Sequence, residues 1–244
     1  MCNLKLVKPH LDLKDEYLSF YQEWKDSGED MVPWVISRDP TSFEAMLEFL
    51  EAHEKGVGLP EGWVSDSTFW LIDDRDRVLG AVNIRHRLSE FLFNAGGHIG
   101  YGIRPSERGK GYASALLKLS LVEAKKLGIE DVLVVCDAWN IASERTIIKN
   151  GGKADRDYIE EDGNVIRRYW IKCVLKRKYI QERYLKLMHG EKIMRRKIIV
   201  FFILSVIALI FIFSSGYRLD SLSAARANSF IPKDAVLLDQ VNYD

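Results

Sequence analysis

Cysteine is scarce in this sequence, and its cysteines have no informative spacing. The 244 residues contain three, Cys2, Cys136 and Cys173. They form neither a pairwise disulfide framework nor the closely spaced pairs that bind zinc. Cys136 and Cys173 lie in apolar stretches that predict strands. We therefore expect reduced thiols in the core of a cytosolic domain and no metal site.

The sequence also lacks an excess of charge of either sign. Its 35 Lys and Arg residues balance 35 Asp and Glu residues. No general electrostatic field attracts DNA or RNA, so we expect no nucleic-acid partner. There is no internal repeat. A composition of 47% hydrophobic and 29% charged residues excludes a disordered chain and suffices for the core of one α/β domain.

The two most frequent nucleotide-binding loops are missing as well. Neither Gly-x-Gly-x-x-Gly with a following acidic residue nor the Gly-Lys-Ser/Thr of a P-loop occurs. Instead, a glycine-rich turn at residues 104–111 separates a predicted strand from a predicted helix. Its glycines expose the backbone, and the free N–H groups at the start of the helix favour an anion. Because Arg108 and Lys110 add positive charge, the turn predicts a diphosphate site.

Two segments resemble a known family. Residues 108–113 carry Arg-x-x-Gly-x-Ala, which resembles the pyrophosphate-binding motif of the GNAT superfamily of N-acetyltransferases. Asn-x-x-Ser at 140–143 and Lys-Asn-Gly at 149–151 are similar to the second coenzyme-contacting segment of that family. The order strand, turn, helix, strand, helix, strand matches over roughly residues 4–175.

The resemblance implies an α/β fold of the GNAT type, with a mixed, mostly antiparallel twisted sheet flanked by helices. It implies acetyl-CoA as cosubstrate, no metal, and an acyltransferase that acetylates a primary amine of a small molecule, peptide or protein. The alternative is a catalytically silent acyl-CoA sensor or a membrane-tethered interaction module. The implied coenzyme contacts are Tyr101, Gly102, Ile103, Arg104, Arg108, Gly109, Lys110, Gly111, Tyr112, Ala113, Ser114, Asn140 and Ser143.

Three residues are candidates for the chemistry. By resemblance, the Ile103 N–H stabilises the oxyanion and Asn140 contacts the pantetheine, although Asn140 also fits a plain helix N-cap. His98 is our preferred general base because its titration range suits deprotonation of an amine, although a structural role stays open for this histidine. The other candidate bases are His86, Glu90, Tyr101 and Asp137.

Other details of the site stay open. Arg104 and Arg108 have an alternative interpretation as surface ion pairs with Glu107 or Glu123. Many family members place a Tyr where Ile147 stands, so the acid that protonates the leaving thiolate is unassigned. The connector around Pro33 is implied to form one wall of the acceptor cleft.

Apolar periodicity predicts the other elements of the domain. We expect an edge strand at 4–8, helices at 12–25 and 42–55, and hairpins at 69–84 and 153–175.

The C-terminal part of the sequence predicts a membrane anchor. Residues 198–216 carry no charge and are long enough to cross a bilayer as a helix, whereas a buried core helix would normally keep a polar face. Basic residues at 195–197 place the N-terminal side in the cytoplasm by the positive-inside rule.

The expected organisation follows from this anchor. It comprises a GNAT domain at 1–175, a basic helical linker at 176–197, a transmembrane helix at 198–216 and a short extracytoplasmic tail at 217–244. We expect a single-pass protein of the cell membrane with the bilayer as a partner. A cytoplasmic protein is the alternative if the tail is cleaved or is a gene-fusion product. A homodimer also stays open.

Overall fold

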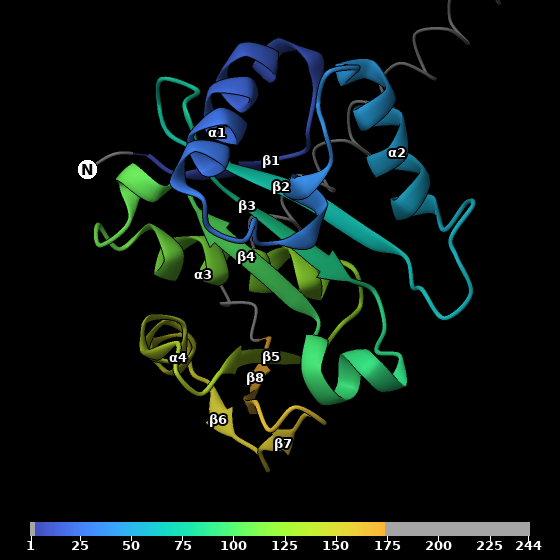
Figure 1. The fold of residues 1–244 in the computed structure, drawn as a ribbon, viewed down its shortest axis with the longest axis vertical. Coiled ribbons are helices and arrows are strands. Elements are labelled where there is room, and N and C mark those ends of the chain that lie inside the picture. The colour runs from blue at the N-terminus through green and yellow to red at the C-terminus, as the bar shows by residue number, and fades with distance from the viewer. Residues whose placement is uncertain (1–2, 174–244) are drawn as a thin grey trace, which may run out of the picture. The chain divides into compact units, whose positions relative to one another are not determined.

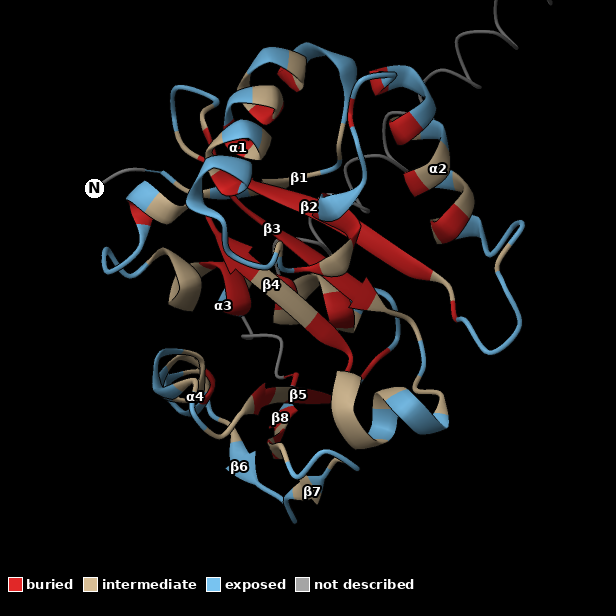
Figure 2. Ribbon diagram, viewed as in Figure 1, coloured by how far each residue is buried: buried red, intermediate tan, exposed pale blue. Residues whose placement is uncertain are grey.

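Four antiparallel strands form the first sheet of the protein, seen in a computed structural model that describes residues 3–173 (Figure 1). They are β1 Lys5–Val7, β2 Asp66–Ile72, β3 Val78–Arg85 and β4 Ile99–Ile103, in the order β1-β2-β3-β4. Every residue of β2 and all but the last of β3 are buried, as Figure 2 shows. Strands covered on both faces favour apolar residues, which explains the apolar runs at 69–72 and 78–82, while the buried polar residues cluster at 66–68 and 83.

Helices cover both faces of this sheet. α1 Lys14–Ser27 and α2 Phe43–Lys55 pack on one face, where Tyr17 stacks on Trp70 with ring centroids 4.2 Å apart. α3 Tyr112–Lys126 packs on the other face and also contacts the second sheet, so one core cluster joins both sheets.

The second sheet is also antiparallel. It contains β5 Asp131–Asp137, β8 Val165–Lys172 and β6 Lys153–Ala154 in that order, with β7 Tyr158–Ile159 paired to β8. α4 Ile141–Lys149 connects β5 to β6. The single sheet that we expected is therefore divided into two.

The two sheets meet at the start of β4. The backbone N–H of His98 donates to the Leu133 carbonyl at 2.7 Å, and the Leu133 N–H donates to Nδ1 of His98 at 2.9 Å. Gly97 has a φ of 64°, and a Cβ at this position would lie 2.8 Å from the Leu133 carbonyl oxygen. Beyond this junction β4 and β5 form no ladder, so the edge of β4 facing β5 stays open.

Most expected elements are present, with shifted ends. β2 begins at Asp66 rather than at 69, and a π-helical segment, η3 Leu92–Gly96, forms where the sequence predicts no helix. Cys136 and Cys173 are buried free thiols, as expected, and burial raises the pKa of each to about 11.

The predicted linker, membrane helix and tail, at 176–197, 198–216 and 217–244, lie outside the described residues, as does Cys2. Within residues 3–173, no helix combines the length and the apolar character needed to cross a membrane.

Candidate functional site

The open edge of β4 presents unpaired backbone groups. Two hydrogen bonds to β3 mark the ends of β4. The His98 carbonyl accepts from the Arg85 N–H at one end, and the Arg104 N–H donates to the Leu79 carbonyl at the other. Bonded residues alternate along an antiparallel ladder, so the even-numbered residues of β4 bond to β3. Tyr101 and Ile103 therefore turn their N–H groups toward β5, and no strand of the described residues pairs with them there.

The glycine turn leads from this edge into α3. Gly109 and Gly111 have φ values of 75° and 84°, a left-handed conformation that favours glycine. A Cβ added at either position would meet nothing within 4 Å, so the turn borders open space. Among the described residues, the N–H groups at 109–114 have no hydrogen-bond acceptor. This row of donors at a helix start is suited to bind a diphosphate.

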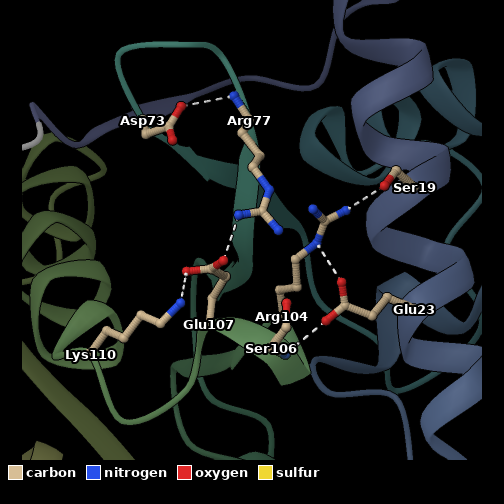
Figure 3. Close-up of polar contacts among 8 residues, drawn as sticks. All are labelled: Ser19, Glu23, Asp73, Arg77, Arg104, Ser106, Glu107 and Lys110. Carbon is tan, nitrogen blue, oxygen red and sulfur yellow. Dashed lines mark hydrogen bonds and ion pairs between the residues drawn. The ribbon is translucent and has the colours of Figure 1, made fainter.

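Behind the turn, the Arg104 side chain is buried and bonded to groups of the protein itself (Figure 3). Its side chain is 2% exposed, its Nη2 donates to Ser19 at 2.9 Å, and its Nε lies 3.3 Å from a carboxylate oxygen of Glu23. The Ser106 N–H donates to the other oxygen of Glu23 at 2.7 Å. Arg104 thus connects the turn to α1, and its guanidinium is not available to bind a phosphate.

The next charges of the turn are also paired. Glu107 is buried and accepts from Arg77 and from Nζ of Lys110, at 2.8 Å for the latter (Figure 3). The hydrogen bond from Lys110, assisted by Arg77, lowers the pKa of Glu107. Arg108 donates to both oxygens of Glu29, at 2.7 and 2.8 Å. The free donors of the turn are therefore its backbone amides, which form a candidate anion cradle that the paired cations support.

The alternative interpretation of the two arginines needs correction. Both form ion pairs, but Arg104 pairs with Glu23 and Arg108 with Glu29, and not with Glu107 or Glu123. Their partners come from α1 and the loop after it, which the sequence spacing around the turn does not reveal.

α4 contributes its first turn to the same region. The side-chain oxygen of Asn140 accepts from the Ser143 N–H at 3.0 Å, so Asn140 is the N-cap of α4. The Tyr101 hydroxyl lies 3.1 Å from Oγ of Ser143 and links β4 to α4. Burial raises the pKa of Tyr101 to about 12, which keeps the hydroxyl protonated at neutral pH. Ile147 is fully buried and carries no acid.

His98 connects the two sheets through its hydrogen bonds to Leu133, and this geometry contradicts a role as general base. Nδ1 already accepts the Leu133 N–H, so the proton of the neutral ring is on Nε2 and no basic lone pair is free. Burial, together with the charge of Arg85, lowers the pKa of His98 to about 4. The structural alternative for this residue is the one that the geometry supports.

The other candidate bases are dispersed. Nε2 of His86 lies 2.9 Å from Oγ of Ser67, and burial lowers the pKa of this histidine. Asp137 accepts from Asn164 at 2.7 Å. Glu90 has no hydrogen bond or ion pair among the described residues, and it lines a groove.

This groove, of about 600 Å³, opens between the segment around η3 and the β7 hairpin. Its charged and aromatic lining consists of Glu90, Glu160, Glu161, Asp162, Phe91 and Tyr158. The carboxylates come from segments some seventy positions apart, which is why the sequence pattern does not reveal them. Such a lining favours cationic groups.

The connector before α2 forms an aromatic wall. Trp34, in η2 Trp34–Ser37, has ring centroids 5.0 Å from Trp63 and 5.6 Å from His53. Nδ1 of His53 lies 3.0 Å from the buried carboxylate of Asp66. The sequence does not reveal this buried polar pair, and the expectation that the connector lines the acceptor cleft stays a prediction.

Three solved structures of other acetyltransferases are similar to this chain, and the one with a TM-score of 0.50 supports the fold. The microcin C7 self-immunity acetyltransferase MccE, in complex with acetyl-CoA and AMP, is 16% identical, with a TM-score of 0.50 over 69% of this chain and 92% of that one. A spermidine N-acetyltransferase from Vibrio cholerae is 15% identical, with a TM-score of 0.48 over 70% and 94%. An N-acetyltransferase from Staphylococcus aureus Mu50 is 18% identical, with a TM-score of 0.47 over 70% and 99%.

Sequence comparison gives the family. No curated protein matches the chain. The family model described as the acetyltransferase (GNAT) domain matches residues 3–153, more than half of the sequence. That range contains the open edge of β4, the anion cradle and the first turn of α4. The chain therefore belongs to the GNAT family of acetyltransferases, enzymes that transfer an acetyl group to an amine.

Proposed function

We propose that the protein transfers the acetyl group of acetyl-CoA to a primary amine of a small molecule, peptide or protein. The observation that carries this proposal is the continuity between the open edge of β4 and the unpaired N–H groups at 109–114. The diphosphate binds the N–H groups, and the extended pantetheine arm runs back along β4 as an added strand would. No residue cluster suited to a metal occurs in the described part of the chain.

The reach of the pantetheine arm decides which amide meets the thioester. Ile103 lies close to the cradle, whereas Tyr101 lies about 6–7 Å farther along the strand. We therefore propose that the Ile103 N–H binds the pantetheine and the Tyr101 N–H polarises the acetyl carbonyl. The Tyr101 hydroxyl, held at α4 by Ser143, then lies on the side where the thiolate leaves.

The amine must lose a proton before it attacks. With His98 excluded, Glu90 is the candidate that lines the groove and has no partner among the described residues. A carboxylate is a weak base for an amine, so we propose that the proton leaves through water toward this groove.

We also propose that residues 198–216 anchor the protein in a membrane with the GNAT domain in the cytoplasm. The uncharged segment and the basic residues before it support this proposal. Fractionation of cells that produce the full chain tests it, because recovery in the soluble fraction would refute an anchor.

Calorimetry with acetyl-CoA and the full chain tests the cradle. Gly111→Asp and Gly128→Asp are a matched pair, because both glycines have left-handed φ values, 84° and 87°, and open space around Cβ. Both variants introduce the same strain and charge, but only position 111 borders the cradle. We expect Gly111→Asp to weaken binding about tenfold or more by repulsion of the diphosphate, and Gly128→Asp to leave it unchanged.

Release of coenzyme A with a broad panel of amines tests the reaction. A folded chain that does not bind acetyl-CoA would refute the proposed function. Binding without release of the thiol for any amine would instead support the sensor.

A further inference from the structure

Arg85, the last residue of β3, is a partly buried cation with few partners. Burial lowers its pKa to about 10, which still leaves it charged at neutral pH. Its Nη1 donates to the Gly96 carbonyl at 3.2 Å. Among the described residues, this is the only hydrogen bond of its side chain, and the guanidinium forms no ion pair within 4 Å. A guanidinium has five N–H donors, and a buried one is normally paired with an acid.

The acid opposite Arg85 does not provide that pairing. Asp66 is its cross-strand partner in the sheet. One oxygen of the Asp66 carboxylate faces Nδ1 of His53 at 3.0 Å, and the other accepts from Nδ2 of Asn83 at 2.5 Å. Asp66 therefore supplies long-range attraction to Arg85, while its hydrogen-bonding capacity is used elsewhere.

Arg85 lies beside the proposed position of the thioester. A Cβ built on Gly100 would lie 3.1 and 3.2 Å from the two terminal nitrogens of Arg85, and 3.4 Å from Cβ of Pro33. The absence of a side chain at 100 thus makes room for the guanidinium over the backbone of β4. The next residue is Tyr101, whose N–H faces the open edge. The guanidinium and Pro33 of the connector therefore both lie close to Gly100, one residue before Tyr101.

We propose that Arg85 binds an acidic group of the acceptor. The acceptor is then an amine that carries a carboxylate a few bonds from its nitrogen, as a free amino acid does. Arginine suits this role because its planar fork binds both oxygens of a carboxylate. This inference deepens the proposed function and rests on it.

The acidic groove is compatible with the same acceptor. Ala95 lines the groove, and the carbonyl of the adjacent Gly96 accepts the hydrogen bond from Arg85. A zwitterion presents an ammonium group to the carboxylates of the groove and a carboxylate to Arg85. A diamine matches only the groove.

The test compares acceptors that differ in a single charge. Release of coenzyme A by the full chain is measured with free amino acids, with their carboxamides and with diamines. The carboxamide keeps the shape and the amine but removes the negative charge. We expect kcat/KM to be about 10- to 100-fold higher for the acids, the range for a lost hydrogen bond between charged groups.

Variants assign this preference to Arg85. Arg85→Gln should abolish the preference mainly through a higher KM for the acids, and Arg85→Lys should restore part of it. Arg87→Gln is the matched control, because Arg87 is exposed two positions along the chain. It should keep the wild-type preference.

The outcomes separate this inference from the proposed function. Turnover of carboxamides or diamines at the same rate as the acids, or faster, overturns the role of Arg85 and leaves acetyl transfer standing. Retention of the full preference in a folded Arg85→Gln variant does the same. If Arg85→Gln does not fold, the comparison of acids with carboxamides by the wild-type chain still decides the acceptor class. Failure to bind acetyl-CoA removes both proposals.

Discussion

Acidification should weaken this protein in part through His98. Burial and the charge of Arg85 hold the pKa of His98 at about 4, against about 6.5 in an unfolded chain. Between these values the unfolded state binds more protons than the folded state, so stability is complete above about pH 6.5 and falls as the pH approaches 4. His98 is only 7% exposed, so solvent screens little of this effect. The shift corresponds to about 3 kcal/mol of unfolding free energy.

Urea unfolding of the full chain, followed by tryptophan fluorescence between about pH 7 and pH 4, measures this loss. His98→Asn is the matched variant, because its amide oxygen replaces Nδ1 as the acceptor for the Leu133 N–H but does not titrate. Acidification should cost the wild type about 3 kcal/mol more than the variant. His98→Ala should lose about 1–3 kcal/mol already at neutral pH, since the buried Leu133 N–H is left unpaired. Parallel loss of stability in the wild type and His98→Asn would refute the reasoning.

Three further predictions concern packing, capping and ligand binding. Gly102→Ala should destabilise the fold by about 1–3 kcal/mol or more, because its Cβ would lie 1.9 Å from the Val32 carbonyl oxygen; an unchanged urea midpoint would contradict this. Asn140→Ala should cost about 1 kcal/mol through the lost cap on the Ser143 N–H, whereas an equal midpoint would mean that water replaces the cap. Acetyl-CoA at about 100 times its Kd should stabilise the folded chain by about 2.7 kcal/mol, and a thermal midpoint that does not rise would count against binding.

Local features of the fold were predictable because neighbours in the sequence create them. Gly109 and Gly111 adopt the left-handed conformation that a turn before a helix requires, and Asn140 caps the helix that follows it. The hairpin of β2 and β3 also follows from two apolar runs on either side of a polar turn. The π-helical segment at 92–96 was missed because it is short and its Asn94 and Gly96 are more typical of a turn than of a helix.

The family and the location of the glycine turn were thus determined by the sequence alone, because the motif requires only consecutive residues. The tertiary structure decided what the charged and titratable side chains do. Arg104 and Arg108 support the turn because Glu23 and Glu29 reach them from α1 and the loop after it. His98 connects the sheets and is not a base, because the N–H of Leu133, thirty-five positions later, donates to the Nδ1 lone pair of His98. Such roles depend on which groups meet across the fold, and contacts between distant segments leave no local pattern in the chain.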